Sequence, residues 1–392
     1  MQFSPLVERI NGEGADAWRT HYEAMAAKDR GEDVIILSVG DPDLDTPAPV
    51  VERAIEALRA GDTHYTPAVG KTAVRQAIAR AHTRRTGQDV GVENVVYLSG
   101  AQNALFAASM CIAGPGDEII TFDPMYSTYP ATLEASGARM VRAPAISDLR
   151  PDLDALSSLI NPRTRAIVWA TPNNPSGVIL SAAELTVIGD LAKQHDLWLI
   201  SDEVYAGLAP DGRVPTLGAR LPDRVITLGS LSKSHAMTGW RAGWLVGPPE
   251  LASHAESLAM CMLFGMPGFI QEAAITALSM AEEAEKRIRD YCNLRRSHLA
   301  AGLAGIPKLR PFIPEAGMFM LVDVRETGLS GYEFMRALYA SQRVSVMDGA
   351  AFGRMTADFV RICFATDETT IDNACARLRD FCEQDLSRNL SG

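Results

Sequence analysis

The sequence predicts an α/β protein with a large domain, built on a mostly parallel sheet flanked by helices, and a smaller α+β domain. From about residue 46, helical patterns alternate with short apolar or β-branched runs, which is typical of a parallel sheet with helices on both faces. Each run stops at a polar cluster, and the C-terminal part has a different pattern. The expected limits are residues 46–285 for the large domain, and residues 1–45 with 286–392 for the small domain.

Five runs are the expected strands of the large domain: "NVVYLSG" (94–100), "EIITFDP" (118–124), "AIVWATP" (166–172), "LWLISDE" (197–203) and "RVITLGS" (224–230). Helical segments such as "NALFAASMCIAG" and "SAAELTVIGDLAKQHD" lie between them. The C-terminal part contains one long amphipathic stretch over about 270–305, strand-like "GMFMLVDV" and "FVRICFA", and helix-like "GYEFMRALYAS" and "TTIDNACARLRDFCEQ". The segment "VIILSVGDPD" is expected to complete the small domain.

Composition narrows the classes of function. A net charge of −11 and the lack of a basic block argue against nucleic acid or an anionic membrane as the main partner. No apolar stretch is long enough to span a bilayer, and the N-terminal segment is acidic where a secretory signal would be basic and then apolar, so we expect a cytoplasmic protein. The cysteines are widely spaced and lack a C-x-x-C pair, which predicts buried free thiols and no metal site.

Polar and aromatic groups follow all five runs. Because ligands of parallel sheets bind beyond the carboxyl ends of the strands, we expect these groups to converge. The N–H groups at a strand-to-helix junction favour a phosphate, and a serine and an arginine can bind the same anion. The groups concerned are Gly100, Ala101 and Gln102 after the first run, Tyr126 after the second, Asn174 after the third, Asp202 and Tyr205 after the fourth, and Ser230, Lys233 and Arg241 after the fifth.

A phosphate cradle, an aromatic ring, a carboxylate and one lysine match the needs of pyridoxal 5′-phosphate, whose aldehyde condenses with a lysine. On these residues the chain resembles the fold-type I, aspartate-aminotransferase-like pyridoxal-phosphate enzymes of class I/II. The resemblance covers nearly the whole chain and rests on motifs that occur in this order: "GDPDLDTP", "HYTPAVGKTAVRQAI", "TPNNPSG", "SDEVY", "SLSKSHAMTGWRAGW" and "VRICFA".

The resemblance implies a role for each residue that contacts the cofactor ring. Lys233 would form the imine with the cofactor and then shuttle the proton between the substrate Cα and the cofactor C4′. Asp202 would keep the pyridine nitrogen protonated. Tyr205 and Asn174 would hydrogen-bond the phenolate oxygen of the ring, and Tyr126 would stack on the ring.

The resemblance also implies a substrate subsite and a dimer. Arg361 in "VRICFA" would bind the substrate α-carboxylate, and Asn174 and the backbone of Gly40 would line the same subsite. Tyr65 in "HYTP" would reach the phosphate in the neighbouring subunit, so the active unit is expected to be a homodimer.

The expected activity is an aminotransferase that moves the α-amino group of an L-amino acid to a 2-oxo acid such as pyruvate. A carbon–sulfur lyase on the same fold is an alternative, and a non-catalytic sensing module is disfavoured because no helix-turn-helix segment precedes the fold. The arginine–pyruvate transaminase branch is the most similar in "GADAWRTHY" and "LAMCMLFGMPGFIQ", which favours arginine or another basic or neutral amino acid. Aspartate or aromatic amino acids remain alternatives, although Ala101 stands where some dicarboxylate-preferring relatives carry a cation. Glu13 and Asp16 are candidates to face a guanidinium.

Overall fold

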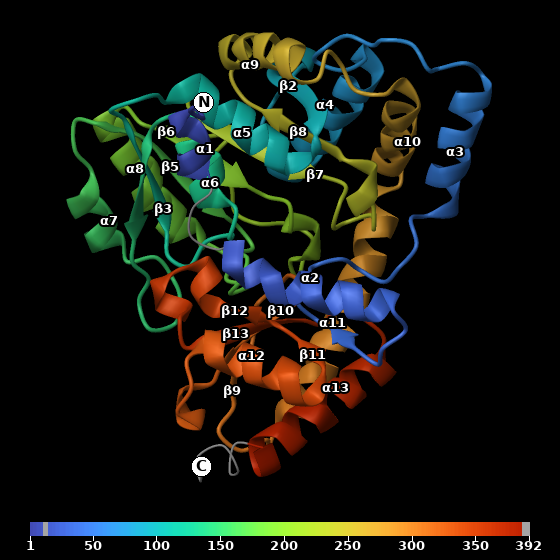
Figure 1. Ribbon diagram of the computed structural model, residues 1–392. Coiled ribbons are helices and arrows are strands. Elements are labelled where there is room, and N and C mark those ends of the chain that lie inside the picture. The colour runs from blue at the N-terminus through green and yellow to red at the C-terminus, as the bar shows by residue number, and fades with distance from the viewer. Residues whose placement is uncertain (11–14, 386–392) are drawn as a thin grey trace.

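The computed structural model describes residues 1–10 and 15–385. A seven-stranded sheet organises the upper part of the molecule in Figure 1. In spatial order its strands are β2 (Val95–Ser99), β8 (Ala242–Val246), β7 (Val225–Ser230), β6 (Trp198–Asp202), β5 (Thr164–Ala170), β3 (Glu118–Phe122) and β4 (Arg139–Ala143). All neighbours pair in parallel except β8, which is antiparallel to both β2 and β7. The predicted mostly parallel sheet is confirmed, and all five expected runs form strands of it.

Helices cover both faces of this sheet because consecutive strand residues point to opposite sides. Val96 and Leu98 pack on one face, with α5 (Gly100–Ile112), α6 (Tyr129–Glu134) and α9 (Pro249–Met262). Val95 and Tyr97 pack on the other face. There the sheet is covered by α3 (Ala48–Arg59), α4 (Thr72–Thr86), α7 (Leu153–Leu159), α8 (Ala182–His195) and α10 (Gly268–Ser279).

The C-terminal part forms a second core, drawn in orange and red at the bottom of Figure 1. An antiparallel sheet runs in the order β12 (Met347–Asp348), β13 (Phe359–Cys363), β10 (Phe319–Asp323) and β9 (Arg310–Phe312). It packs with α11 (Ala281–Leu303), α12 (Gly331–Gln342) and α13 (Glu368–Asp380). The N-terminal β1 (Ile35–Ile36) pairs in parallel with β11 (Val344–Ser345).

Two N-terminal helices lie on this framework. The short α1 (Pro5–Ile10) contacts α6. The longer α2 (Ala15–Asp29) contacts β1, β11, β12 and α12, and Figure 1 shows it lying across the molecule between the upper sheet and the C-terminal elements. The segment that follows β1 reaches the loop after β7, where the carbonyl of Gly40 accepts a hydrogen bond from Lys233.

Two expectations need correction. The amphipathic stretch over 270–305 is two helices, because Met280 leaves the helical conformation (φ −108°) between α10, which packs on the large sheet, and α11, which enters the C-terminal core. All six cysteines are free, but two of them are not buried as expected: Cys261 on α9 is exposed, and Cys111 on α5 is half-buried. In the part of the chain that the structure describes, no helix combines the length and apolar composition needed to cross a membrane.

Candidate functional site

A cavity of about 190 Å³ lies at the carboxyl ends of the parallel strands, between the large sheet and the C-terminal part. It is lined by residues from all five strand ends and by residues of other segments, among them Gly40 and Arg361. The predicted residues that line it are Gly40, Ala101, Gln102, Tyr126, Asn174, Asp202, Tyr205, Ser230, Lys233, Arg241 and Arg361. The predicted Gly100 does not line the cavity, but it stands next to the guanidinium of Arg241, which does.

One end of the cavity is built to hold an anion. Helix α5 begins directly after β2, and the Ser99 side chain does not cap it, so the first N–H groups of the helix are free of a side-chain acceptor. The two guanidinium NH₂ nitrogens of Arg241 donate to the carbonyl oxygens of Thr238 (2.9 Å) and Ser99 (3.1 Å), which holds the cation beside the helix start. A helix N-terminus and an arginine in this arrangement favour a phosphate.

Glycines allow this close approach of helix, arginine and strand. Gly100 has a φ of +81°, a conformation that residues with a Cβ rarely adopt. A Cβ at this position would collide with the Arg241 guanidinium, and a Cβ at Gly243 on β8 would collide with the backbone of Gly100. The loop after β7 is fixed as well, because the Ser230 hydroxyl donates to the carbonyl of Ala242 (2.9 Å).

Asp202 supplies a carboxylate in the middle of the cavity. Its Oδ2 accepts a hydrogen bond from the Tyr129 hydroxyl (2.8 Å), and its Oδ1 accepts one from the backbone N–H of Val204 (3.2 Å). Among the described residues no lysine or arginine pairs with it. Burial raises the pKa of Asp202, and the Tyr129 hydrogen bond acts in the opposite direction. This carboxylate is suited to bind a cationic ring nitrogen.

Lys233 is the amine of the cavity. Its Nζ donates a hydrogen bond to the backbone carbonyl of Gly40, which brings the segment after β1 against the loop after β7. Burial lowers the pKa of Lys233, while the charge of Asp41 raises it. A lysine with a lowered pKa has a larger neutral fraction near neutral pH, which is what a nucleophilic amine needs.

Arg361 on β13 forms the other end of the cavity. Its side chain is only 2 % exposed and lies between the rings of Phe319 (3.9 Å from the guanidinium carbon to the ring centre) and Phe352 (4.5 Å). Its two NH₂ nitrogens donate to Asn174 Oδ1 (2.9 Å) and to the carbonyl of Ser38 (2.6 Å). A fixed, buried guanidinium with hydrogens to spare is a carboxylate-binding group.

Sequence reasoning missed several residues of the cavity. Ser232 lines it from within the "SLSK" motif, where the alternate serine was a visible candidate. Tyr129 does not line the cavity but donates a hydrogen bond to Asp202 from α6; it stands three residues after the predicted Tyr126. Trp18 lines the cavity from α2; it lies within the quoted segment "GADAWRTHY", but it was assigned no role in the site.

Two other predicted positions lie elsewhere. Tyr65 does not line the cavity; its ring is 86 % exposed and stands edge-on to that of Phe264, with 4.8 Å between the ring centres. Glu13 lies outside the described residues, as does the side chain of Asp16.

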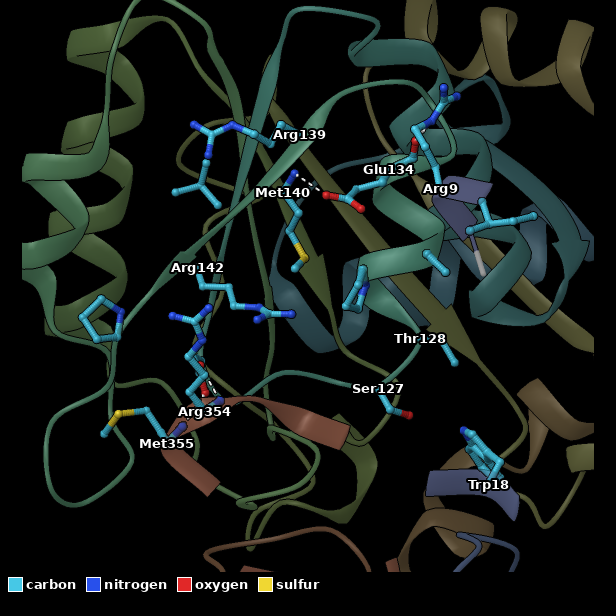
Figure 2. Close-up of a pocket in the computed structure, with 16 residues that line it drawn as sticks. Arg9, Trp18, Ser127, Thr128, Glu134, Arg139, Met140, Arg142, Arg354 and Met355 are labelled. Carbon is cyan, nitrogen blue, oxygen red and sulfur yellow. Dashed lines mark hydrogen bonds between the residues drawn. The ribbon is translucent and has the colours of Figure 1, made fainter. Parts of the chain in front are cut away.

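A larger cavity, of about 840 Å³, shares Trp18 with the first one. Figure 2 shows it between α6 and β4, with Arg9, Arg139, Arg142 and Arg354 around it. Its acidic members are already used as acceptors: Asp123 by the backbone N–H groups of residues 354 and 355, and Glu134 by that of residue 140. The smaller cavity, and not this one, holds the groups that converge from the strand ends.

The residues of the smaller cavity fit pyridoxal 5′-phosphate. The uncapped start of α5 and Arg241 match its phosphate, Asp202 matches its pyridine nitrogen, and Lys233 matches its aldehyde. Tyr126 offers a ring to stack on, and it is itself packed edge-on against Tyr129. Arg361 then remains free for an anionic group of a second molecule.

Comparison with known proteins places the chain in a family. The sequence model of "Aminotransferase class I and II" matches residues 32–378. The chain is 47% identical over 382 residues to the arginine–pyruvate transaminase AruH of Pseudomonas aeruginosa, covering 96% of this chain and 97% of that protein. It is 33% identical to an aspartate aminotransferase of Pyrococcus horikoshii, covering 90% and 91%.

A solved structure agrees with these sequence relatives. The aspartate aminotransferase of Thermus thermophilus with maleate superimposes with a TM-score of 0.91 at 30% identity, covering 97% of this chain and 99% of that one. The fold, the cofactor fit and the relatives therefore agree. The chain belongs to the aminotransferase class I and II family and is a pyridoxal-phosphate-dependent aminotransferase.

Proposed function

We propose that this protein transfers the α-amino group of L-arginine, or of another basic or neutral L-amino acid, to a 2-oxo acid such as pyruvate. One observation carries the choice of substrates: the 47% identity to the arginine–pyruvate transaminase of Pseudomonas aeruginosa over 96% of this chain. Relatives named aspartate aminotransferase are less similar, at 28% to 33% identity. Ala101, which lines the cavity, also offers no cation for a second substrate carboxylate.

The residues of the cavity support an amino-group transfer. Bound pyridoxal phosphate supplies an electron sink that makes the substrate Cα–H acidic. Arg361 and Asn174 would hold the substrate α-carboxylate, and a carboxylate paired with a fixed guanidinium is retained rather than lost as carbon dioxide. Lys233 would then accept the proton from the substrate Cα and deliver it to the cofactor C4′. Its amine lines the cavity and can act as this base.

Asp202 and Tyr205 would tune this chemistry. Asp202 would hold a proton on the cofactor pyridine nitrogen, because an opposite charge at close range favours the charged ring. The Tyr205 ring packs edge-on against Phe319 (6.0 Å between ring centres), and burial raises the pKa of its hydroxyl, so it would stay a hydrogen-bond donor to the cofactor.

We propose that the active unit is a homodimer in which Tyr65 reaches the phosphate of the neighbouring site. The exposed rings of Tyr65 (86 %) and Phe264 (54 %) support this, because they form an apolar surface next to a loop that carries a predicted cofactor residue. The loop is well anchored, since the Thr66 hydroxyl donates to the carbonyl of Met266 (2.7 Å). The cytoplasmic location and the domain limits stay predictions.

A substrate panel tests the proposal. The purified enzyme is incubated with each L-amino acid and either pyruvate or 2-oxoglutarate, and the product amino acid is quantified. We expect L-arginine with pyruvate to be among the best pairs. A preference for L-aspartate with 2-oxoglutarate would overturn the substrate assignment but not the reaction class. Release of ammonia and pyruvate from cysteine conjugates, without any 2-oxo acid, would instead indicate a carbon–sulfur lyase.

A further inference from the structure

Helix α2 is connected to Arg361 by a chain of hydrogen bonds that the proposed function does not use. His21, on α2, is 8 % exposed, and its Nδ1 lies 2.9 Å from the hydroxyl of Ser38. The backbone carbonyl of the same Ser38 accepts the hydrogen bond from Arg361 (2.6 Å). The His21 imidazole is therefore hydrogen-bonded to Ser38, the residue whose carbonyl accepts a hydrogen bond from the Arg361 guanidinium.

The hydrogens of this chain have a consistent direction. The hydroxyl of Ser345 on β11 donates to the Ser38 hydroxyl (3.0 Å), which leaves the Ser38 proton for Nδ1 of His21. An accepting Nδ1 requires a neutral imidazole. Burial and the nearby charge of Arg361 both lower the pKa of His21, which agrees with a neutral ring. Ser38 and Ser345 are fully buried, so water does not compete for these bonds.

The same helix also reaches the cavity directly. The rings of Trp18 and His21 meet edge-on, with 5.6 Å between their centres. Trp18 lines the cavity that holds Lys233 and Arg361, and it also lines the larger cavity together with Ser127 and Thr128, which Figure 2 labels. One helix thus contacts both the substrate space and the support of the carboxylate-binding arginine.

We propose that His21 is a positioning residue for the substrate carboxylate: through Ser38 it fixes the guanidinium of Arg361, so that helix α2 sets the affinity of the site for carboxylates. The inference rests on the proposed role of Arg361. Ser38 provides the backbone acceptor of this guanidinium, and Asn174 provides its side-chain acceptor. Loss of the imidazole would leave the Ser38 hydroxyl without its acceptor and loosen one of these two supports.

The test measures carboxylate affinity separately from turnover. Pyruvate is titrated into the enzyme loaded with pyridoxal phosphate, where no amino group is available for transfer, and its dissociation constant is measured by calorimetry. For His21→Ala we expect this dissociation constant and the KM for L-arginine to rise together by about fivefold to tenfold, because the loss of one neutral hydrogen bond has an effect of this size. We expect kcat to change little. His21→Asn places an acceptor where Nδ1 was, and we expect it to restore both constants to within about twofold of the parent.

Controls separate the inference from the proposed function. His254→Ala changes an exposed histidine on α9 and leaves both constants unchanged. Arg361→Lys weakens pyruvate binding if Arg361 binds the carboxylate; unchanged binding in this variant would overturn the proposed role of Arg361. If Arg361→Lys weakens binding while His21→Ala does not, or if His21→Asn is as impaired as His21→Ala, the role of His21 is overturned and that of Arg361 stands. Should His21→Ala fail to fold, His21→Gln, whose amide reaches the position of Nε2 instead of Nδ1, takes its place with the same expected loss.

Discussion

Lys233 donates to a backbone carbonyl and has no carboxylate partner among the described residues, so its amine is free to lose a proton. We expect Lys233→Ala to lower kcat by about 10²–10⁴-fold, the range for a positioned acid–base group. The variant should still bind pyridoxal phosphate, because Arg241 and the start of α5 are unchanged. Turnover assays and cofactor content after gel filtration measure the two effects. Lys193→Ala, an exposed lysine on α8, is the matched control, and normal turnover in Lys233→Ala would refute the assignment.

The second prediction concerns the effect of the Tyr129 hydroxyl on the pKa of Asp202. Burial raises the pKa of Asp202, and the hydrogen bond from Tyr129 lowers it. The Tyr129→Phe variant loses this hydrogen bond, so the pKa of Asp202 should rise further. Asp202 must be ionised to hold the ring proton, and the acidic limb of the pH dependence of kcat should therefore move to higher pH. A hydrogen bond to a charged group contributes about 1.5–3 kcal/mol, which corresponds to roughly one to two pH units.

Tyr332→Phe removes an exposed hydroxyl on α12 and serves as the control for this profile. A profile of Tyr129→Phe that coincides with those of the parent and the control would show that the bond does not tune Asp202.

At this scale the sequence predicted residues that sit in short motifs. Lys233 and Asp202 stand at the ends of strand-like runs, so their convergence could be inferred from the alternation of helices and strands. Arg361 was predicted from the resemblance to the family. Tyr129, Trp18 and His21 could not be found this way. These residues lie on helices that pack against the site. Which face of a helix is turned toward the site depends on tertiary contacts, and the local sequence pattern does not specify them.

Among the elements, the contact between β8 and α5 decides the geometry of the phosphate end. We expect Gly243→Ala to destabilise the fold by about 1–3 kcal/mol through overpacking, since its Cβ would meet the backbone of Gly100. The displaced helix start should also weaken cofactor affinity. Denaturant unfolding and cofactor titration measure both effects. Gly239→Ala is the control, because a Cβ at that glycine has no atom within 4 Å. Equal stability and equal cofactor affinity of the two variants would show that the contact between β8 and α5 does not set the geometry of the phosphate end.

The elements themselves were only partly predictable. The five expected strands are correct because buried parallel strands are continuous apolar runs between turn residues. The edge strand β4 was not predicted, since its sequence "RMVRA" contains two arginines and is neither a continuous apolar run nor a regular alternation. The antiparallel strand β8 was not predicted either, because its first residues were included in the motif "SLSKSHAMTGWRAGW". The division of residues 268–303 into two helices depends on two different cores, which the amphipathic pattern alone does not distinguish.

For the whole molecule, the proposed homodimer makes the site depend on two chains. A subunit with Tyr65→Ala and a subunit with Lys233→Ala are each expected to be impaired, by weaker cofactor binding and by loss of the amine respectively. Refolding the two together should restore activity at low cofactor concentration, because one site of the mixed dimer then has Lys233 from one chain and Tyr65 from the other. Mixing that restores nothing would contradict the shared site.

The central claim is that this aminotransferase moves the amino group of arginine to pyruvate, and one spectroscopic measurement tests it most directly. The enzyme loaded with pyridoxal phosphate is mixed with L-arginine in the absence of any 2-oxo acid, and its visible absorption is followed. We predict that the visible band of the cofactor disappears within seconds to minutes and returns when pyruvate is added. A band that L-arginine leaves unchanged, while L-aspartate removes it, would contradict the claim.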